Sequence, residues 1–305
     1  MVHAISGVPA ESLRRAARLY GEASYATICY GLGITEHAHG TDGVRTLTNL
    51  AILTGRLGTN LGGGINPLRG QNNVQGASDV GALPDLLPGY QKLADDQAVG
   101  RFERAWSVTL GRTRGLWIPE MFDAAVEGRL KALWVMGEDI RQTDPDVEHV
   151  DAAIDACELV ISQEILLSRT AERADVVLPA ASFLEKDGTF VNFDRRVQRV
   201  RPALSPPSGA RPDFDILHLI ARALDADLNL PTPAAAMAEC ARLTPTFAGI
   251  SHQRLDRDGG LHWPCRSPKD PGERQLYLHG FDTPTRLARL HAKHYLPPGE
   301  AADED

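Results

Sequence analysis

Residues 131–179 read KALWVMGEDIRQTDPDVEHVDAAIDACELVISQEILLSRTAERADVVLP. Three short apolar runs in this stretch are typical of buried strands, and they cover residues 131–136, 158–162 and 175–178. A helical pattern lies between the first two strands, and a shorter one lies between the last two. The alternation of apolar strands with helices predicts a parallel sheet covered on both faces, and therefore an α/β fold.

The ends of these three strands are where a ligand is expected, because open α/β sheets bind ligands beyond the carboxyl ends of their strands. The first strand ends in Gly137-Glu138-Asp139, and the second ends in Gln163-Glu164. A carboxylate at this place can accept hydrogen bonds from ribose hydroxyls or ring nitrogens. The alternative for Asp139 is a purely structural role as a helix N-cap.

A charged turn follows the third strand. Lys186, Asp187 and Gly188 place a cation beside a tight turn, near the strand end at Pro179. Two interpretations stay open for this turn, a contact with a phosphate group and an ordinary surface turn. Beyond it, residues 189–201 are expected to be extended and basic, and residues 211–224 and 234–243 are expected to form amphipathic helices.

The most unusual polar stretch is NPLRGQNNVQG at residues 66–76, which follows three consecutive glycines. It combines the guanidinium of Arg69 with five side-chain amides, including that of Gln71. Glycines allow the backbone to approach a ligand, and an arginine can hold a carboxylate through two hydrogen bonds. The alternative is a solvated loop, and the whole of residues 55–91 is expected to be irregular. A helix capped by Asp42 is expected to precede it, at residues 42–53.

Composition limits the classes of function. With 305 residues, the chain is expected to hold two domains. Its net charge of −8 argues against nucleic-acid binding as its main function. No run of eighteen apolar residues and no export signal occur, so we expect no membrane span and a cytoplasmic location.

Metal and dinucleotide motifs of the usual spacing are not found. The four cysteines lie far apart without a CxxC, so this chain by itself is not expected to hold an iron–sulfur cluster or a four-cysteine zinc site. His37 and His39 are better read as solvated or structural than as metal ligands. Gly31-Leu32-Gly33 fails as a dinucleotide fingerprint because position 36 is Glu, which counts against the alternative of an unrelated nicotinamide-dependent α/β enzyme.

Several long segments together resemble one family. They are GINPLRGQNNVQGASDVGALPDLLPGYQ at 64–91, ALWVMGEDI at 132–140, ISQEILLSRTAERADVVLPAASFLEKDGTFVNFDRRVQRVRPAL at 161–204 and ARPDFDILHLIARAL at 210–224. They are similar to the catalytic (alpha) subunit of molybdopterin-dependent formate dehydrogenases, in the molybdopterin oxidoreductase superfamily. RGQNNVQG is specific to the formate dehydrogenase branch, and DVVLPAASFLEKDGTFVN is specific to the wider superfamily. The resemblance extends from about Gly7 to about Tyr295.

The resemblance implies an activity and a cofactor. Formate is oxidised to CO₂ at molybdenum or tungsten, which two molybdopterin guanine dinucleotides hold, and electrons pass to iron–sulfur clusters and electron-transfer subunits. By position, Arg69 matches the arginine that orients formate, and Gln71 follows it in the same pocket. The remaining positions match cofactor-binding loops: Gly137, Glu138, Asp139 and Thr143; Gln163, Glu164 and Ile165; Lys186, Asp187, Gly188 and Asn192. Relatives usually have Asp where Glu164 stands.

The larger departure from the family pattern is the absence of expected parts. The chain has no Cys-His dipeptide and no clustered cysteines, although the family ligates the metal through Cys or selenocysteine and carries an iron–sulfur cluster near its N-terminus. The barrel that closes the family's C-terminus is also not recognised. We therefore expect the central part of a catalytic subunit, inactive alone, that works with the remaining parts of that subunit or a split-gene neighbour. The alternative is a non-catalytic pterin-binding module or subunit of a split molybdopterin oxidoreductase.

The resemblance also predicts how the domains are arranged. Two α/β lobes, each with a mostly parallel sheet, are expected. Residues 1–70 together with 183–245 would form the first lobe, and residues 71–182 would form the second, of dinucleotide-binding type. Residues 246–305 would form a loop-rich extension that ends in a frayed acidic tail.

Overall fold

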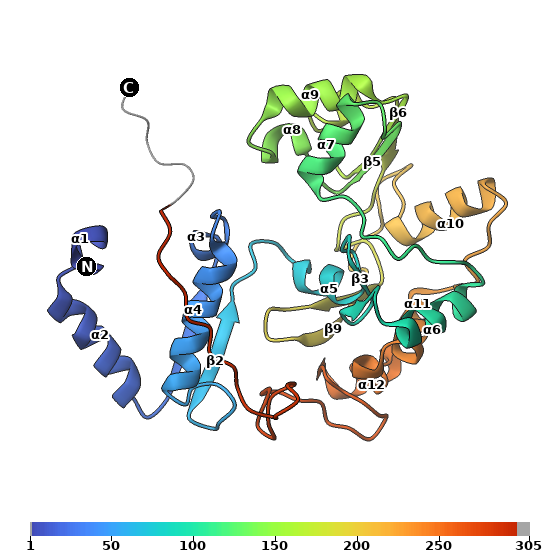
Figure 1. Ribbon diagram of the computed structural model, residues 1–305. Helices are drawn as coiled ribbons and strands as arrows, with labels where there is room; N and C mark the ends of the chain where they lie inside the picture. The colour runs from blue at the N-terminus through green and yellow to red at the C-terminus, as the bar shows by residue number, and fades with distance from the viewer. Residues whose placement is uncertain (1, 298–305) are drawn as a thin grey trace, which may run out of the picture. The chain divides into compact units, whose positions relative to one another are not determined.

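The computed structural model describes residues 2–297 (Figure 1). The acidic tail from residue 298 onward lies outside the described residues. Contacts along the chain divide it into two compact units. One unit comprises Met1–Gln75, Val191–Arg196 and Gly272–Asp305, and the other comprises Gly76–Phe190 and Val197–Pro271.

The larger unit, Gly76–Phe190 with Val197–Pro271, contains the predicted parallel sheet. Its strands are β5 (Ala132–Met136), β6 (Leu159–Glu164) and β7 (Val176–Pro179), in the order β5-β6-β7. Both pairings are parallel, with Trp134 opposite Ile161 and Ser162 opposite Val177. The three apolar runs therefore share one sheet, as the sequence predicts, and the α/β fold class is confirmed.

Helices pack against this sheet and complete its core. They are α7 (Ile118–Val126), α8 (Ile140–Thr143) and α9 (Val147–Ala156), and a 3₁₀ turn, η1 (Ala171–Arg173), precedes β7. The buried cluster consists of Phe122, Ala125, Val135, Ile140, Val150, Ala153, Ile154 and Val160. Strands and helices both contribute apolar side chains to this cluster. Their burial holds the strand ends, and the loops that follow them, in place.

The rest of the larger unit surrounds a second apolar cluster formed by Leu87, Val99, Phe102 and Leu243. The elements before the parallel sheet are β3 (Leu86–Leu87), β4 (Gln91–Lys92) and α6 (Asp96–Trp106). Those after it are β8 (Gly188–Val191), β9 (Arg196–Val200), α10 (Asp213–Ala223), α11 (Pro233–Leu243), η2 (Pro245–Phe247), α12 (His252–Asp258) and β10 (Leu261–His262). Strands β8, β9 and β10 form a three-stranded sheet in the order β10-β9-β8. The stretch expected to be extended is thus a hairpin.

The smaller unit contains a second parallel strand pair. Its elements are α1 (Val2–Ser6), α2 (Ala10–Glu22), β1 (Ala26–Tyr30), α3 (Leu32–Thr35), α4 (Gly40–Leu53) and β2 (Gly62–Pro67). Strands β1 and β2 are parallel, and Tyr30 lies opposite Pro67. Parallel sheets therefore occur in both units, as expected.

Residues 55–91 are not the irregular loop that the composition indicates. They contain β2, the short helix α5 (Val74–Asp79) and the antiparallel pair β3–β4. Gly62 explains why the pattern misleads, since a Cβ built there would lie 2.5 Å from the carbonyl oxygen of Ala26 on β1. The glycines of β2 allow a close backbone approach that local strand propensity does not register.

The helix expected from Asp42 starts earlier, at Gly40. Asp42 lies inside its first turn, where Oδ1 accepts a hydrogen bond from Arg45 at 3.1 Å and forms an ion pair with Lys293 at 2.8 Å. Asp42 is therefore not the N-cap, and its carboxylate anchors the later segment that contains Lys293.

The two compact units have different boundaries from the two predicted lobes. Residues 197–245 belong with residues 76–190 and not with residues 1–70. Several long-range contacts account for this grouping: Gln163 Nε2 donates to Asp213 at 2.7 Å, and Trp106 Nε1 donates to Glu239 at 2.9 Å. A local sequence pattern does not reveal such pairings.

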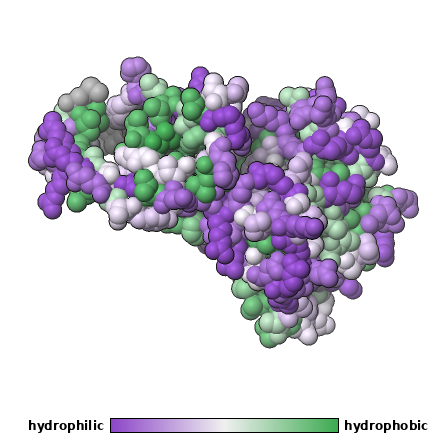
Figure 2. Space-filling model, turned by 90° about the horizontal axis from the view of Figure 1, so that it is seen from below, coloured by the Kyte–Doolittle hydropathy of each residue, from purple (hydrophilic) through white to green (hydrophobic). Residues whose placement is uncertain are grey.

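The surface combines polar and apolar areas. Large exposed side chains include Leu166, Leu167 and Leu53, which are 73%, 70% and 69% exposed. Figure 2 shows apolar patches beside polar ones on the face that it draws. None of the helices within residues 2–297 has the length and apolar character needed to cross a membrane.

Candidate functional site

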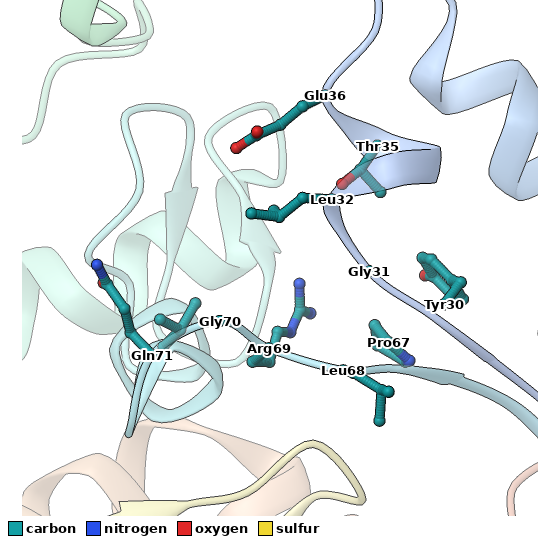
Figure 3. Close-up of a pocket in the computed structure, with 11 residues that line it drawn as sticks. Tyr30, Gly31, Leu32, Thr35, Glu36, Pro67, Leu68, Arg69, Gly70 and Gln71 are labelled. Atoms are coloured by element: carbon teal, nitrogen blue, oxygen red, sulfur yellow. The ribbon is translucent and has the colours of Figure 1, made fainter. Parts of the chain in front are cut away.

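Arg69 and Gln71 line one cavity in the smaller unit (Figure 3). The carboxyl ends of β1 and β2 meet at the same edge, so the segments that follow each strand come together. The cavity has a volume of about 310 Å³, and its lining residues are Tyr30, Gly31, Leu32, Thr35, Glu36, Pro67, Leu68, Arg69, Gly70, Gln71 and Val74. This arrangement puts an arginine at the end of a parallel strand pair, where α/β folds bind ligands.

The Arg69 guanidinium is oriented by a neighbouring amide. Its Nε and Nη2 atoms donate to Oε1 of Gln75, at 3.2 and 3.0 Å. Gln75 is only 6% exposed, so its amide is a fixed support. One edge of the guanidinium is thereby committed, and the edge that carries Nη1 remains for a ligand.

Tyr30 shares the electrostatic environment of Arg69. Burial raises the pKa of the Tyr30 hydroxyl, and the positive charge of Arg69 partly offsets this effect. Tyr30 therefore stays a neutral hydroxyl over the ordinary pH range, and Arg69 supplies the positive charge of the cavity.

A second group of predicted residues lies at the edge of the β5–β6–β7 sheet. The N–H of Gly137 donates to the carbonyl of Gln163 at 2.8 Å, which ties the ends of β5 and β6 together. Gln163 is fully buried, and its Nε2 donates to Oδ1 of Asp213. Lys186 Nζ forms an ion pair with Oδ2 of the same carboxylate at 2.5 Å. Gln163 and Lys186 thus meet at Asp213, and Gly137 is joined to Gln163 through the backbone.

Asp213 is a residue of this cluster that the sequence analysis does not single out. It begins α10, directly after Pro212. An acidic residue in the first turn of a helix is common because it complements the helix dipole, so this position gives no signal of a site. Its two contacts, with Gln163 and Lys186, distinguish it.

The loop after β5 uses its acidic residues to stabilise itself. Asp139 stands at the N-cap position of α8 but makes no side-chain cap. Its carboxylate instead accepts from the N–H and hydroxyl of Thr170, at 3.0 and 2.6 Å, and from the N–H of Arg169 at 3.3 Å. Burial raises the pKa of Asp139, but the hydrogen bonds from Thr170 and Arg169 prevail and hold it below its ordinary value. Glu138 accepts from the Thr143 hydroxyl at 2.6 Å.

The remaining predicted residues are placed differently. Glu164 accepts from the N–H of Ile165 at 2.7 Å, and the Ile165 side chain is exposed. Asp187 forms an ion pair with Arg199 at 2.8 Å, just before Gly188 begins β8. Asn192 lies in the β8–β9 turn within the smaller unit, where its Oδ1 accepts from the N–H of Arg196 at 3.0 Å. The side chains of Asp187 and Asn192 therefore have local partners.

The profile of one protein family matches most of the chain. It is described as "Molybdopterin oxidoreductase", and it matches residues 16–223. The chain belongs to the molybdopterin oxidoreductase family. The matched residues include both groups of side chains described above, around Arg69 and around Asp213. The family is named for its cofactor.

Within the family, the chain is similar to several proteins named as formate dehydrogenases. The chain is 44% identical over 304 residues to "F420-dependent formate dehydrogenase 2 subunit alpha" of Methanococcus maripaludis, which covers 99% of the chain and 44% of that relative. It is 42% identical over 303 residues to the "F420-dependent formate dehydrogenase subunit alpha" of Methanocaldococcus jannaschii, covering 99% and 44%. It is 40% identical over 300 residues to "Formate dehydrogenase H" of Escherichia coli, covering 97% and 42%.

The resemblance to formate dehydrogenase catalytic subunits is therefore confirmed. The chain spans less than half the length of these relatives. The family membership counts against the alternative of an unrelated nicotinamide-dependent α/β enzyme.

The residues around Asp213 are chemically compatible with the guanine dinucleotide that the resemblance implies. Within the part of the chain that the structure describes, Oε1 of Gln163 is buried without a hydrogen-bond partner. Gly137 has a φ of 66°, and a Cβ built there meets nothing within 4 Å, so the strand end has open space beside it. A lysine, an amide and a carboxylate are the donors and acceptors that phosphate, guanine and ribose require.

Proposed function

We propose that this chain forms the central, cofactor- and substrate-binding part of a formate dehydrogenase catalytic subunit that oxidises formate to CO₂. The observation that carries the proposal is the Arg69 cavity, where a guanidinium with one free edge stands at the end of a parallel strand pair. The names of the similar proteins support formate as the substrate.

In the proposed reaction, Arg69 binds the carboxylate of formate and fixes the direction of its C–H bond. The hydrogen bonds from Arg69 to Gln75 orient the guanidinium before the substrate arrives. Such preorganisation contributes to rate because a correctly held substrate needs no further ordering. Gln71, on the same loop, offers amide hydrogen bonds to the bound anion.

We also propose that the residues around Asp213 hold the dinucleotide part of a molybdenum or tungsten bis-molybdopterin guanine dinucleotide. Lys186 would bind a phosphate, and Glu138 and Gln163 would bind guanine or ribose. When bound, this group supplies the redox centre that takes two electrons from formate. The other proposed contacts of the cofactor are Gly137, Asp139, Thr143, Glu164, Ile165, Asp187, Gly188 and Asn192.

Metal ligation and electron transfer would be performed by polypeptide segments outside this chain. The metal-ligating residue, the iron–sulfur cluster and the electron-transfer subunits would come from the rest of the catalytic subunit and its neighbours. This chain alone would then turn over little or no formate, and the complex would act in the cytoplasm.

A second candidate is a pterin-binding module without turnover. The name of the matched family supports it, because that name gives molybdopterin and no substrate. The two candidates differ in whether a complex containing this chain oxidises formate.

Substitution of Arg69 tests the leading proposal. The chain is purified together with the products of neighbouring genes, and formate oxidation is measured per bound molybdenum or tungsten. Arg69→Lys replaces a planar fork by a point charge, so kcat should fall and KM should rise, with a loss in kcat/KM on the order of a hundredfold. Arg15→Lys, on the exposed helix α2, is the matched control and should not change either constant. Wild-type kinetics in Arg69→Lys would refute the role of Arg69.

A further inference from the structure

Glu36 is a charged group of the Arg69 cavity to which the function proposed above assigns no role. It follows α3 directly and lines the cavity together with Thr35 and Leu32. Figure 3 shows the carboxylate of Glu36 and the guanidinium of Arg69 extending into the same space, with Leu32 between them. The hydrogen bonds of Arg69 run to Gln75 and not to Glu36, so the cavity presents a cation and a separate anion.

The position of Glu36 is fixed by the packing of α3 on α4. Its N–H donates to the carbonyl of Leu32 at 2.8 Å. Gly40 on α4 approaches the same turn so closely that a Cβ there would lie 2.1 Å from the carbonyl oxygen of Thr35. His37, the next residue, is tied back to the Gly33 carbonyl at 3.0 Å through its ring Nε2. Glu36 is therefore held at the rim of the cavity by the backbone that carries it.

A charge of each sign in one cavity has a consequence for ligand choice. A small monocarboxylate can place its only negative charge on Arg69, and it then presents an uncharged end to the rest of the cavity. A dicarboxylate of similar size that binds Arg69 brings its second negative charge into the space that Glu36 shares. Like charges in a shared site repel each other, and the repulsion weakens as salt screens it.

We propose that Glu36 is a specificity-determining residue that admits monocarboxylates to the Arg69 cavity and rejects dicarboxylates of similar size. This inference rests on the proposed function, since it takes Arg69 as the carboxylate-binding group. In this proposal, Glu36 selects ligands by their charge, whereas Arg69 and Gln75 position the bound carboxylate.

The test compares binding of two anions to the full chain. Saturation-transfer NMR follows the protons of sodium formate and of sodium malonate at neutral pH, and a titration of each gives its dissociation constant. In the wild-type chain, formate should bind and malonate should bind more weakly. In Glu36→Gln, the ratio of the malonate constant to the formate constant should fall about fivefold, the effect of two unit charges roughly 4 Å apart in water.

Three further arms make the result specific. Glu36→Asp keeps the charge and should keep the discrimination. Glu22→Gln, at the exposed end of α2, removes the same charge away from the cavity and should leave the ratio unchanged. In salt of about 1 M, where the screening length is roughly 3 Å, the difference between the wild-type chain and Glu36→Gln should shrink.

Arg69→Gln separates the two hypotheses. If it abolishes formate binding while Glu36→Gln leaves the ratio unchanged, the role of Glu36 is wrong and the role of Arg69 stands. If Arg69→Gln binds formate as well as the wild-type chain, or if the wild-type chain shows no saturation transfer to formate, the carboxylate-binding role of Arg69 fails. The inference about Glu36 then fails with it.

Discussion

The contact between Gln75 and Arg69 shows how a single buried amide prepares a charged side chain for binding. The amide oxygen accepts two N–H groups of the guanidinium, and the chain around it excludes water. Without this acceptor, the guanidinium would sample several rotamers, and binding a carboxylate would include the cost of ordering it.

Replacing Gln75 should therefore impair formate oxidation without removing the charge. Gln75→Leu is expected to lower kcat/KM about tenfold in the cofactor-loaded complex, which corresponds to one hydrogen bond to a charged group. Steady-state kinetics per bound metal measure this effect, and Gln253→Leu, on the surface of α12, serves as the matched control. Unchanged kinetics in a folded Gln75→Leu chain would show that the amide does not position Arg69.

At the scale of residues, the sequence identifies Arg69 but not its supports. Arg69 stands out because a lone guanidinium among amides and glycines is an unusual composition. Gln75 and Asp213 become important only through the atoms that they contact, Arg69 in one case and Gln163 and Lys186 in the other. A sequence without coordinates does not contain those contacts, because side-chain pairings depend on the completed packing.

The turn between α3 and α4 depends on a glycine contact. Gly40→Ala would place a methyl group 2.1 Å from the Thr35 carbonyl oxygen, so α3 must move away from α4. The expected loss is about 1–3 kcal/mol in the free energy of unfolding, as for other overpacked sites. Urea unfolding measures it. Gly33→Ala, whose added Cβ meets nothing within 4 Å, is the control and should not be destabilised. Equal stability of the two variants would contradict this account of the turn.

The N-terminus of α7 carries a carboxylate whose titration is strongly shifted. The side chain of Arg114 donates to both oxygens of Glu120, at 2.6 and 2.7 Å, and the N–H of Trp117 donates at 2.9 Å. The hydrogen bond from Arg114, and after it that from Trp117, lower the pKa of Glu120 from 4.5 to about 2. Since the folded pKa is the lower one, the stabilising effect is complete above pH 4.5 and is lost as the pH falls towards 2.

An NMR titration of the side-chain carboxyl carbons checks this shift. Glu120 should titrate near pH 2 in the wild-type chain and clearly higher in Arg114→Met, where the hydrogen bond from Trp117 remains but the larger effect of Arg114 is lost. A wild-type midpoint near 4.5 would mean that the contact with Arg114 does not persist in solution.

At the scale of elements, apolar runs are predictable and glycine strands are not. Strands β5, β6 and β7 were predictable because each contains a run of consecutive apolar residues in the sequence, and the helical segments between them favour parallel pairing. Strand β2 begins with three glycines and contributes little apolar surface, so only its pairing with β1 identifies it.

At the scale of the whole molecule, long-range contacts decide which segments group together. Residues 197–245 join residues 76–190 through pairs such as Gln163 with Asp213, which are 50 positions apart. The predicted lobes were drawn from the resemblance along the chain, and they stay a prediction about the fold of the complete catalytic subunit. The roles of the sheet-edge residues are likewise predictions until the cofactor is measured.

The cofactor-binding role predicts the effect of one substitution on the complex. Glu138 is expected to bind the guanine dinucleotide, so Glu138→Ala should reduce the amount of pterin that co-purifies with the complex. Glu158→Ala, at the opposite end of β6 where Glu158 pairs with Lys131, is the matched control. Pterin fluorescence after oxidative release quantifies the loss. Equal pterin content in wild type and Glu138→Ala would remove Glu138 from the site.

The most direct test of the central claim is the cofactor content of the chain purified with the products of neighbouring genes. Elemental analysis gives molybdenum and tungsten per chain, and acid hydrolysis followed by chromatography gives guanine nucleotide per chain. The account predicts about one metal atom and about two guanine nucleotides per chain, as one metal held by two molybdopterin guanine dinucleotides requires. A purified complex that oxidises no formate and contains neither metal nor guanine nucleotide would contradict it.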